Sequence, residues 1–206
     1  FGTLDIQDGV IGTNPDLTAG EDGMLSCEEN SGEVTISGGI VYGMEVNEGA
    51  SVTVSGGDGH KGRWTNNGGT LSITGGTFKD VQFVNSSTIA ISGGTFGTIT
   101  NTGASGSIPL MPLLADNYAF YQGDNAQNGT EVTLTNVTVR PHTHSFENGK
   151  CGCGVAAIVV DNNNSCYSTL QAALDAAANN AAITSVTLGQ DLTEDVTFNG
   201  SAAGSL

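Results

Sequence analysis

A short repeat at nearly constant spacing restricts the possible folds of this chain more than any other feature of its sequence. Each copy alternates apolar with small polar residues and ends in Ser-Gly-Gly or Thr-Gly-Gly, which is typical of a half-buried strand followed by a turn. The spacing between successive copies never differs by more than a single position. The four copies span 33–39, 51–57, 70–76 and 88–94.

A row of asparagines keeps nearly the same period. Each asparagine follows a short apolar or aromatic segment, so we expect two short strands per repeat, with Asn at one corner and Gly-Gly at the other. The amides are expected to stack in a ladder, and glycine suits a corner that needs positive φ or close backbone approach. The row consists of Asn30, Asn47, Asn66 and Asn85, extended less regularly by Asn101.

Equal spacing favours coils in which each strand stacks on the same strand of the next coil, as in a parallel β-helix. An antiparallel meander is the alternative, but it would not need equal spacing. The β-helix predicts two inward ladders of apolar side chains. One ladder is Val34, Val52, Leu71 and Ile89, and the other is Ile36, Val54, Ile73 and Ile91.

The string Ile-Ser-Gly-Gly-Thr-Phe at 91–96 resembles the repeat of adhesin-like, right-handed parallel β-helix proteins on the surface of Gram-positive gut bacteria. The resemblance covers about residues 30 to 121. The segment 113–121 is similar to the one that closes such helices. The resemblance implies an all-β, right-handed solenoid in an extracellular location, at the bacterial cell surface or secreted.

The period breaks at 107–125, where Pro109 and Pro112 cannot donate hydrogen bonds to a sheet. Aromatic residues follow at Tyr118, Phe120 and Tyr121. They predict a hydrophobic cap on the solenoid, with an aromatic platform for a sugar or a partner as the alternative. We therefore expect a first domain, 1–125, that comprises the β-helix and its closing cap.

Residues 126–155 are expected to form a strand, at 131–140, and a His/Cys linker module. His142, His144, Cys151 and Cys153 offer the nitrogen and sulfur ligands of tetrahedral zinc. His-x-His and Cys-x-Cys are tighter than common zinc spacings, although alternate residues of a strand do face the same side. A structural zinc, a disulfide and unbound thiols all remain open, whereas four ligands would leave no position for a catalytic metal.

The last segment, 156–206, reads as strand, helix, strand, strand, a small C-terminal α/β segment. The pattern predicts strands at 156–160, 183–188 and 195–198, and a helix at 168–180 with Ser168 as its N-cap. This segment either begins a second β-helix or packs against the first. The first residue is Phe1, which favours a mature or excised piece of a longer multidomain surface protein.

Charge excludes several function classes. Five Lys and Arg against 21 Asp and Glu give a formal net charge of −16. Five cations are too few to bind nucleic acid by neutralising its phosphates. The chain also lacks the long apolar run that crosses a bilayer, so we expect no membrane insertion. Outward positions mix Thr, Ser and Ala, which disfavours an ice-binding face.

A carbohydrate-active enzyme, either a polysaccharide lyase or a glycosidase, is the alternative function. Its best candidate site is the 58–64 loop, where His60 and Asp58, with Asp80 from the next coil, could do acid–base work beside Lys61. A solvated loop with balancing charges explains the same residues. A chain of this charge would also repel the polyuronates that such a lyase cleaves.

We expect instead a non-catalytic binding, adhesion or spacer module with no required cofactor. A solenoid face would contact a host glycoprotein, immunoglobulin among the candidates, or a glycan. Aromatic residues dominate binding hot spots, so aromatic residues of the solenoid and its cap are the candidate contacts, together with two cations. They are Trp64, Tyr42, Arg63, Lys79, Tyr118 and Tyr121.

Overall fold

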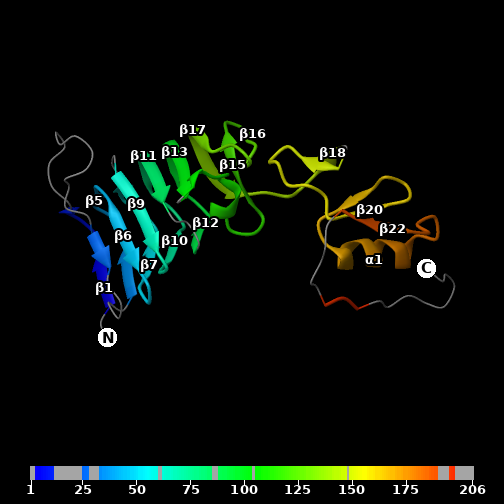
Figure 1. Ribbon diagram of the computed structural model, residues 1–206, viewed down its shortest axis with the longest axis horizontal. Coiled ribbons are helices and arrows are strands. Elements are labelled where there is room, and N and C mark those ends of the chain that lie inside the picture. Colours follow the sequence, from blue (N-terminus) through cyan, green and yellow to red (C-terminus); the bar gives the residue numbers. More distant parts are fainter. Residues whose placement is uncertain are drawn as a thin grey trace. The chain divides into compact units, whose positions relative to one another are not determined.

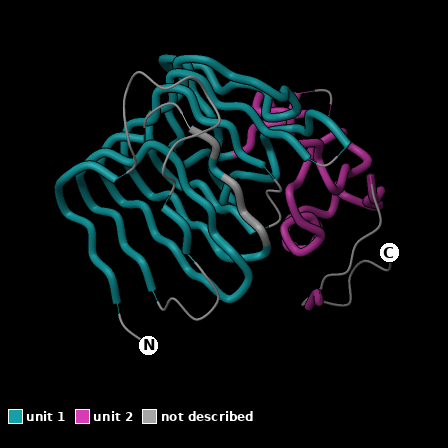
Figure 2. The backbone as a smooth tube through the Cα atoms, turned by 60° about the vertical axis from the view of Figure 1, so that its left-hand side comes forward, with its two compact units in different colours: residues 1–143 teal, residues 144–206 magenta. Residues whose placement is uncertain are grey.

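The computed structural model describes residues 3–11, 25–27, 33–59, 62–84, 88–103, 105–147, 149–189 and 195–197, without the side chains of 63 and 65–67. The chain divides into two compact units, Phe1–Thr143 and His144–Leu206 (Figure 2). The first unit is a parallel β-solenoid of about 4 turns, which confirms the predicted fold class.

One sheet of the solenoid consists of the repeat strands, all parallel (Figure 1). Val34 pairs with Val52, and Leu71 pairs with both Val52 and Ile89, which is the register that the repeat predicts. A fifth strand, which the repeat search missed, precedes them at a wider spacing, since Leu4 pairs with Val34. The strands are β1 (Thr3–Ile6), β4 (Glu33–Ile36), β7 (Ser51–Val54), β10 (Thr70–Ile73) and β12 (Ile89–Ile91).

The second sheet completes each coil. Early coils contribute two short strands to it, and later coils contribute one strand of eight or nine residues. The early coils therefore have three strands rather than the expected two. These strands are β2 (Val10–Ile11), β3 (Leu25–Cys27), β5 (Ile40–Val41), β6 (Met44–Asn47), β8 (Asp58–Gly59), β9 (Gly62–Asn67), β11 (Thr77–Val84) and β13 (Thr95–Gly103).

The core lies between the two sheets, and both predicted ladders are buried in it, with every member at most 6% exposed. Because the strands stack in register, each inward side chain contacts its counterpart in the next coil. Aromatic side chains fill the space facing the ladders. Phe78 and Phe96 stack at 4.9 Å between ring centroids, and Trp64 meets Phe78 edge-on at 5.4 Å.

The two glycines of each Gly-Gly corner serve different purposes. At the first glycine a side chain would collide with the preceding coil: a Cβ on Gly75 would lie 2.3 Å from the carbonyl oxygen of Ser55. The second has positive φ, +81° at Gly57 and +101° at Gly94. The corner therefore needs both properties that the sequence indicated, one at each position.

The expected ladder of asparagines is not formed as predicted. Asn66 pairs with Val46, and Asn67 pairs with Asn47, so the predicted row is out of register by a single position. Asn101 lies opposite Phe83, where it is fully buried and donates to the carbonyl oxygen of Pro109 at 2.7 Å. Asn30 and Asn85 lie outside the described residues.

An antiparallel layer follows the last coil. Strand β17 (Thr133–Pro141) pairs with β13 on one side and with β15 (Tyr118–Gln122) on the other. Leu110, Leu113 and Phe120 are fully buried and belong to the same core as the ladders, as expected of a hydrophobic cap. The elements are β14 (Gly106–Ser107), the short 3-10 helix η1 (Met111–Leu113), β15 (Tyr118–Gln122), β16 (Asn125–Ala126) and β17 (Thr133–Pro141).

The described residues of the second unit form a hairpin, a three-stranded antiparallel sheet and one helix. Thr169, and not Ser168, caps the helix, because its hydroxyl accepts from the amide of Ala172 at 3.1 Å. Residues 195–197, the described part of the last predicted strand, form no strand. The elements are β18 (Phe146–Glu147), β19 (Lys150–Cys151), β20 (Val159–Asp161), β21 (Cys166–Tyr167), α1 (Leu170–Asn179) and β22 (Val186–Leu188).

In the described part of the chain, no helix is long and apolar enough to span a membrane.

Candidate metal centre

The hairpin β18–β19 brings the cysteine pair back toward the histidine pair. Phe146 pairs with Cys151, and Glu147 pairs with Lys150. Gly149 adopts φ of +78° in the connecting turn, a conformation that glycine reaches without strain. Ligand atoms of His142, His144, Cys151 and Cys153 consequently all lie within 4.8 Å of one another.

A turn, and not a strand, places the two cysteines on the same side. Cys151 is the last residue of β19, and Cys153 lies in the turn that follows. The amide of Cys151 donates to the carbonyl oxygen of Val155 at 2.8 Å, and Gly154 donates to that of Cys151 at 2.9 Å. The strand-based argument for convergence was therefore wrong in its geometry, although the four side chains do converge.

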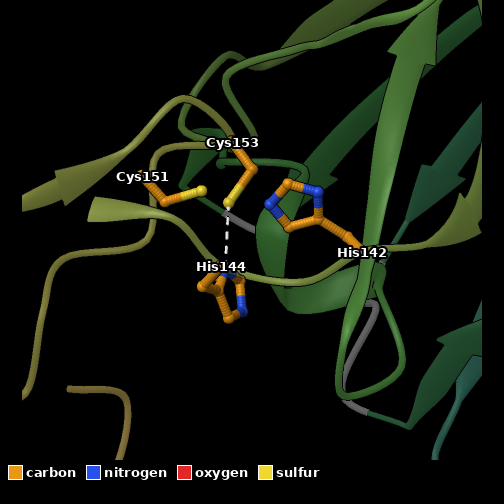
Figure 3. A group of neighbouring side chains, drawn as sticks. All are labelled: His142, His144, Cys151 and Cys153. Carbon is orange, nitrogen blue, oxygen red and sulfur yellow. Dashed lines mark hydrogen bonds between the residues drawn. The ribbon is translucent and has the colours of Figure 1, made fainter. Parts of the chain in front are cut away.

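The four side chains point toward a common centre (Figure 3). Nδ1 of His144 lies 3.4 Å from Sγ of Cys153. One ring nitrogen of His142 points toward Cys153, and the other points away (Figure 3). The sulfur side is closed to solvent, with Cys151 and Cys153 only 6% and 4% exposed, while both histidines are half-buried.

Burial raises the pKa of the Cys153 thiol to about 11, and the neighbouring Cys151 adds to the increase. Desolvation disfavours the charged form of the Cys153 thiol in this closed site. A cation beside its sulfur would compensate for that cost. The site therefore has the donors and the electrostatic need for a positively charged metal.

Tyr121 contacts the outer side of the site through His142. Its hydroxyl oxygen lies 2.6 Å from Nδ1 of His142. The guanidinium of Arg140 lies 4.0 Å from the centroid of the Tyr121 ring, and it donates to the carbonyl oxygen of Gly123 at 2.7 Å. The sequence predicted Tyr121 as a partner contact and indicated nothing of this hydrogen bond, because a tyrosine so far from His142 along the chain carries no local signal of it.

Trp64 is not a surface residue. It is 1% exposed and packs edge-on against Phe78 and Phe83, so it cannot meet a partner, and the prediction that it does is wrong. Inward strand positions of a coil accept an aromatic residue as readily as an aliphatic one. The one tryptophan of the chain therefore fills the core.

The other candidate contacts are scattered over the solenoid. Lys79 is exposed on β11, and Tyr42 and Tyr118 are half-buried. Arg63 belongs to β9, but its side chain is outside the described residues.

The alternative catalytic residues are only partly described. Asp58 lies exposed on β8 and pairs with Thr77, and Asp80 lies exposed on β11 and pairs with Thr98. His60 and Lys61 fall outside the described residues. The catalytic arrangement of the 58–64 loop therefore stays a prediction.

Comparisons with known proteins give no further constraint: no family model matches the chain, and neither a curated protein nor a solved structure is significantly similar to it.

Proposed function

We propose that this chain is a non-catalytic β-solenoid module that holds one structural zinc ion through His142, His144, Cys151 and Cys153. The convergence of these four ligand atoms within 4.8 Å is the observation that carries the proposal. Four protein ligands would fill the coordination shell of zinc and leave no open position for a substrate. The ion would order the segment 142–153, which follows the solenoid in sequence.

The donor set favours zinc over other metals. Two thiolates and two imidazoles are the ligands of tetrahedral Cys₂His₂ zinc sites, while magnesium and calcium prefer oxygen. A divalent ion would also neutralise the thiolate of Cys153, whose burial raises the pKa of that thiol. Chemistry and electrostatics thus support the same ion.

Metal analysis of protein purified without chelators tests the zinc site. We expect about one zinc per chain, and loss of that zinc in Cys151→Ser combined with Cys153→Ser. Cys166→Ser is the matched control, because Cys166 lies outside the cluster and its thiol contacts the carbonyl oxygen of Asn164 instead. Zinc-free wild-type protein, or equal zinc in all variants, would refute the proposed site.

We further propose that the module belongs to an adhesin-like surface protein of a Gram-positive gut bacterium and presents a solenoid face to a host glycoprotein or glycan. The resemblance of the repeat, the solenoid itself and the net charge of −16 support this proposal. Lys79, Tyr42, Arg63 and Tyr118 are the side chains through which we expect contact. Tyr121 is less suited to it, because Arg140 covers one face of its ring.

An array of host glycoproteins, immunoglobulin and glycans tests this second part. Binding without turnover, weakened in Lys79→Ala, is the expected result. Loss of polysaccharide on incubation, abolished by His60→Ala, would show instead that the chain is a carbohydrate-active enzyme. Absence of any binding would contradict the adhesive role and leave that of a spacer.

A further inference from the structure

The two histidines of the cluster present different nitrogens to the cysteines. In His144 it is Nδ1 that lies 3.4 Å from Sγ of Cys153. In His142, Nδ1 is engaged by the hydroxyl of Tyr121 at 2.6 Å. The ring nitrogen that points toward Cys153 in Figure 3 is therefore Nε2.

The position of the Tyr121 hydroxyl is set by the cap sheet. Tyr121 pairs with Thr138 across the β15–β17 ladder, and Ala119 pairs with Arg140 in the same ladder. Arg140 then holds the phenol ring from above, 4.0 Å from its centroid, and its guanidinium is itself fixed by Gly123 and Asp124. The amide of His142 donates to the carbonyl oxygen of Asn117 at 2.8 Å, which fixes the backbone of the histidine as well.

A neutral imidazole carries its proton on one nitrogen and offers the other to a metal. Which nitrogen is protonated follows from the hydrogen bond that the ring makes on its outer side. If Nε2 of His142 is the metal ligand, Nδ1 carries the proton, and Nδ1–H donates a hydrogen bond to the hydroxyl oxygen of Tyr121. The observed geometry suits this tautomer.

We propose that Tyr121 is a positioning residue of the metal site. It accepts a hydrogen bond from Nδ1–H of His142, fixes the tautomer and the orientation of that ring, and so presents Nε2 to the ion. Arg140 supports this role by holding the ring of Tyr121. The inference rests on the proposed zinc site and adds to it that His142 binds through Nε2 and His144 through Nδ1.

Tyr121→Phe removes the hydroxyl and keeps the ring under Arg140, so it isolates the hydrogen bond. Zinc affinity is measured by competition with a chromophoric chelator, and the protonated nitrogen of His142 is read from long-range ¹H–¹⁵N correlation spectra. We expect zinc affinity to fall by about tenfold or more, in the range typical of lost outer-shell partners. We also expect zinc-free wild-type protein to show His142 protonated on Nδ1, and the variant to lose that preference.

Tyr167→Phe is the matched control. It also removes a hydrogen bond from a half-buried tyrosine, but the partner of Tyr167 is Asp161, which is not one of the four residues of the cluster. Its zinc affinity and the His142 spectrum should equal those of the wild type. A similar loss in this control would show that general destabilisation, and not the position of Tyr121, weakens the site.

Measurements on the wild type and on Tyr121→Phe distinguish failure of the proposed zinc site from failure of the proposed role of Tyr121. Wild-type protein that binds no zinc refutes the proposed site itself, and with it this inference. Wild-type protein that binds zinc, together with a Tyr121→Phe variant of equal affinity and unchanged His142 tautomer, refutes the role of Tyr121 alone. Ligation of His142 through Nδ1 in the zinc-loaded protein would refute it too.

Discussion

Gly59 shows at the scale of a single residue how the solenoid accommodates its aromatic core. It is buried on β8, and a Cβ placed on it would lie 2.2 Å from Cδ1 of Phe78. The Phe78 ring stacks on Phe96 and meets the edge of Trp64, so it cannot move aside. Because Gly59 has no side chain, its coil leaves the space that the Phe78 ring of the next coil occupies.

Gly59→Val should accordingly destabilise the solenoid by about 1–3 kcal/mol, the usual cost of overpacking a core. Urea unfolding followed by the fluorescence of Trp64 measures the change. Gly103→Ala is the control, since a Cβ there would be 3.6 Å from Ile108, an ordinary contact, and should change stability by less than about 0.5 kcal/mol. Equal stabilities for both variants would contradict the tight packing.

Asp161 gives the second unit a pH-dependent contact. Burial alone would raise the pKa of this carboxyl, but hydrogen bonds from the amides of Ser165 and Asn163 and from the hydroxyl of Tyr167 outweigh it and lower the pKa. Because the pKa of the carboxyl is lower in the folded than in the unfolded chain, it stabilises the fold at pH values above the unfolded pKa of about 3.9. The contribution is lost as pH falls through the still lower folded pKa.

We therefore expect the loop 161–165 to be ordered at about pH 5 and to lose its hydrogen bonds only well below about pH 4. The amide signals of Asn163 and Ser165 report this transition in NMR spectra recorded at successive pH values. Asp161→Asn should weaken the loop at neutral pH and abolish the transition. An unaltered pH profile in that variant would contradict the role of the carboxylate.

At the scale of elements, α1 holds a later segment of the chain through one side chain. The amide group of Gln171 donates to the carbonyl oxygen of Thr197 at 2.9 Å and accepts from the Thr197 amide at 2.8 Å. It thereby supplies both hydrogen bonds that a neighbouring strand would supply. Residues 195–197 were predicted as part of a strand, and a side chain takes the place of the strand partner.

Gln171→Leu should release this segment, because both hydrogen bonds are lost while the helix keeps a good helix-forming residue. Hydrogen exchange of the Thr197 amide should accelerate by about fivefold, which corresponds to a typical net hydrogen bond of about 1 kcal/mol. The amides of α1 serve as the internal control and should exchange as before. Unchanged protection of Thr197 would show that other contacts hold it.

The elements also show what sequence alone can predict. The strands of the repeat follow from alternation and spacing, because a shift by a single position would expose every member of a ladder such as Val34 and Val52. β1 has the same alternation but stands further from β4 than the later copies stand from one another, so a search for equal spacing overlooks it. The asparagine row failed because the corners, unlike the ladders, need not keep the same register.

The candidate metal site was predictable from the sequence only in part. The four ligands could be recognised by residue type and proximity in sequence, and Asn148-Gly149 indicated the turn. The contacts of Tyr121 and Arg140 beside the site could not be recognised, because the positions of these residues depend on the pairing of β15 with β17. Trp64 was misassigned because its neighbours in sequence do not reveal on which side of a coil it lies.

At the scale of the whole molecule, the charge of the chain is not balanced. The chain has 21 acidic residues and five Lys and Arg, so acidic side chains exceed Lys and Arg by 16. Self-repulsion of this kind opposes the folded state and is screened by salt. Stability should therefore depend on ionic strength.

The midpoint of thermal unfolding should rise when ionic strength increases from about 0.01 M to about 0.15 M, as the screening length falls from about 30 Å to about 8 Å. Circular dichroism in sodium chloride measures the shift, and sucrose at matched osmolality controls for effects unrelated to charge. A midpoint that stays constant or falls with salt would contradict the account of repulsion.

The zinc site is the central claim, and X-ray absorption at the zinc edge tests it most directly, because it reports the ligand atoms themselves. For zinc-loaded wild-type protein we predict a shell of two sulfurs at about 2.3 Å and two imidazole nitrogens at about 2.0–2.1 Å. A shell of oxygen and nitrogen without sulfur would contradict the proposed centre of His142, His144, Cys151 and Cys153.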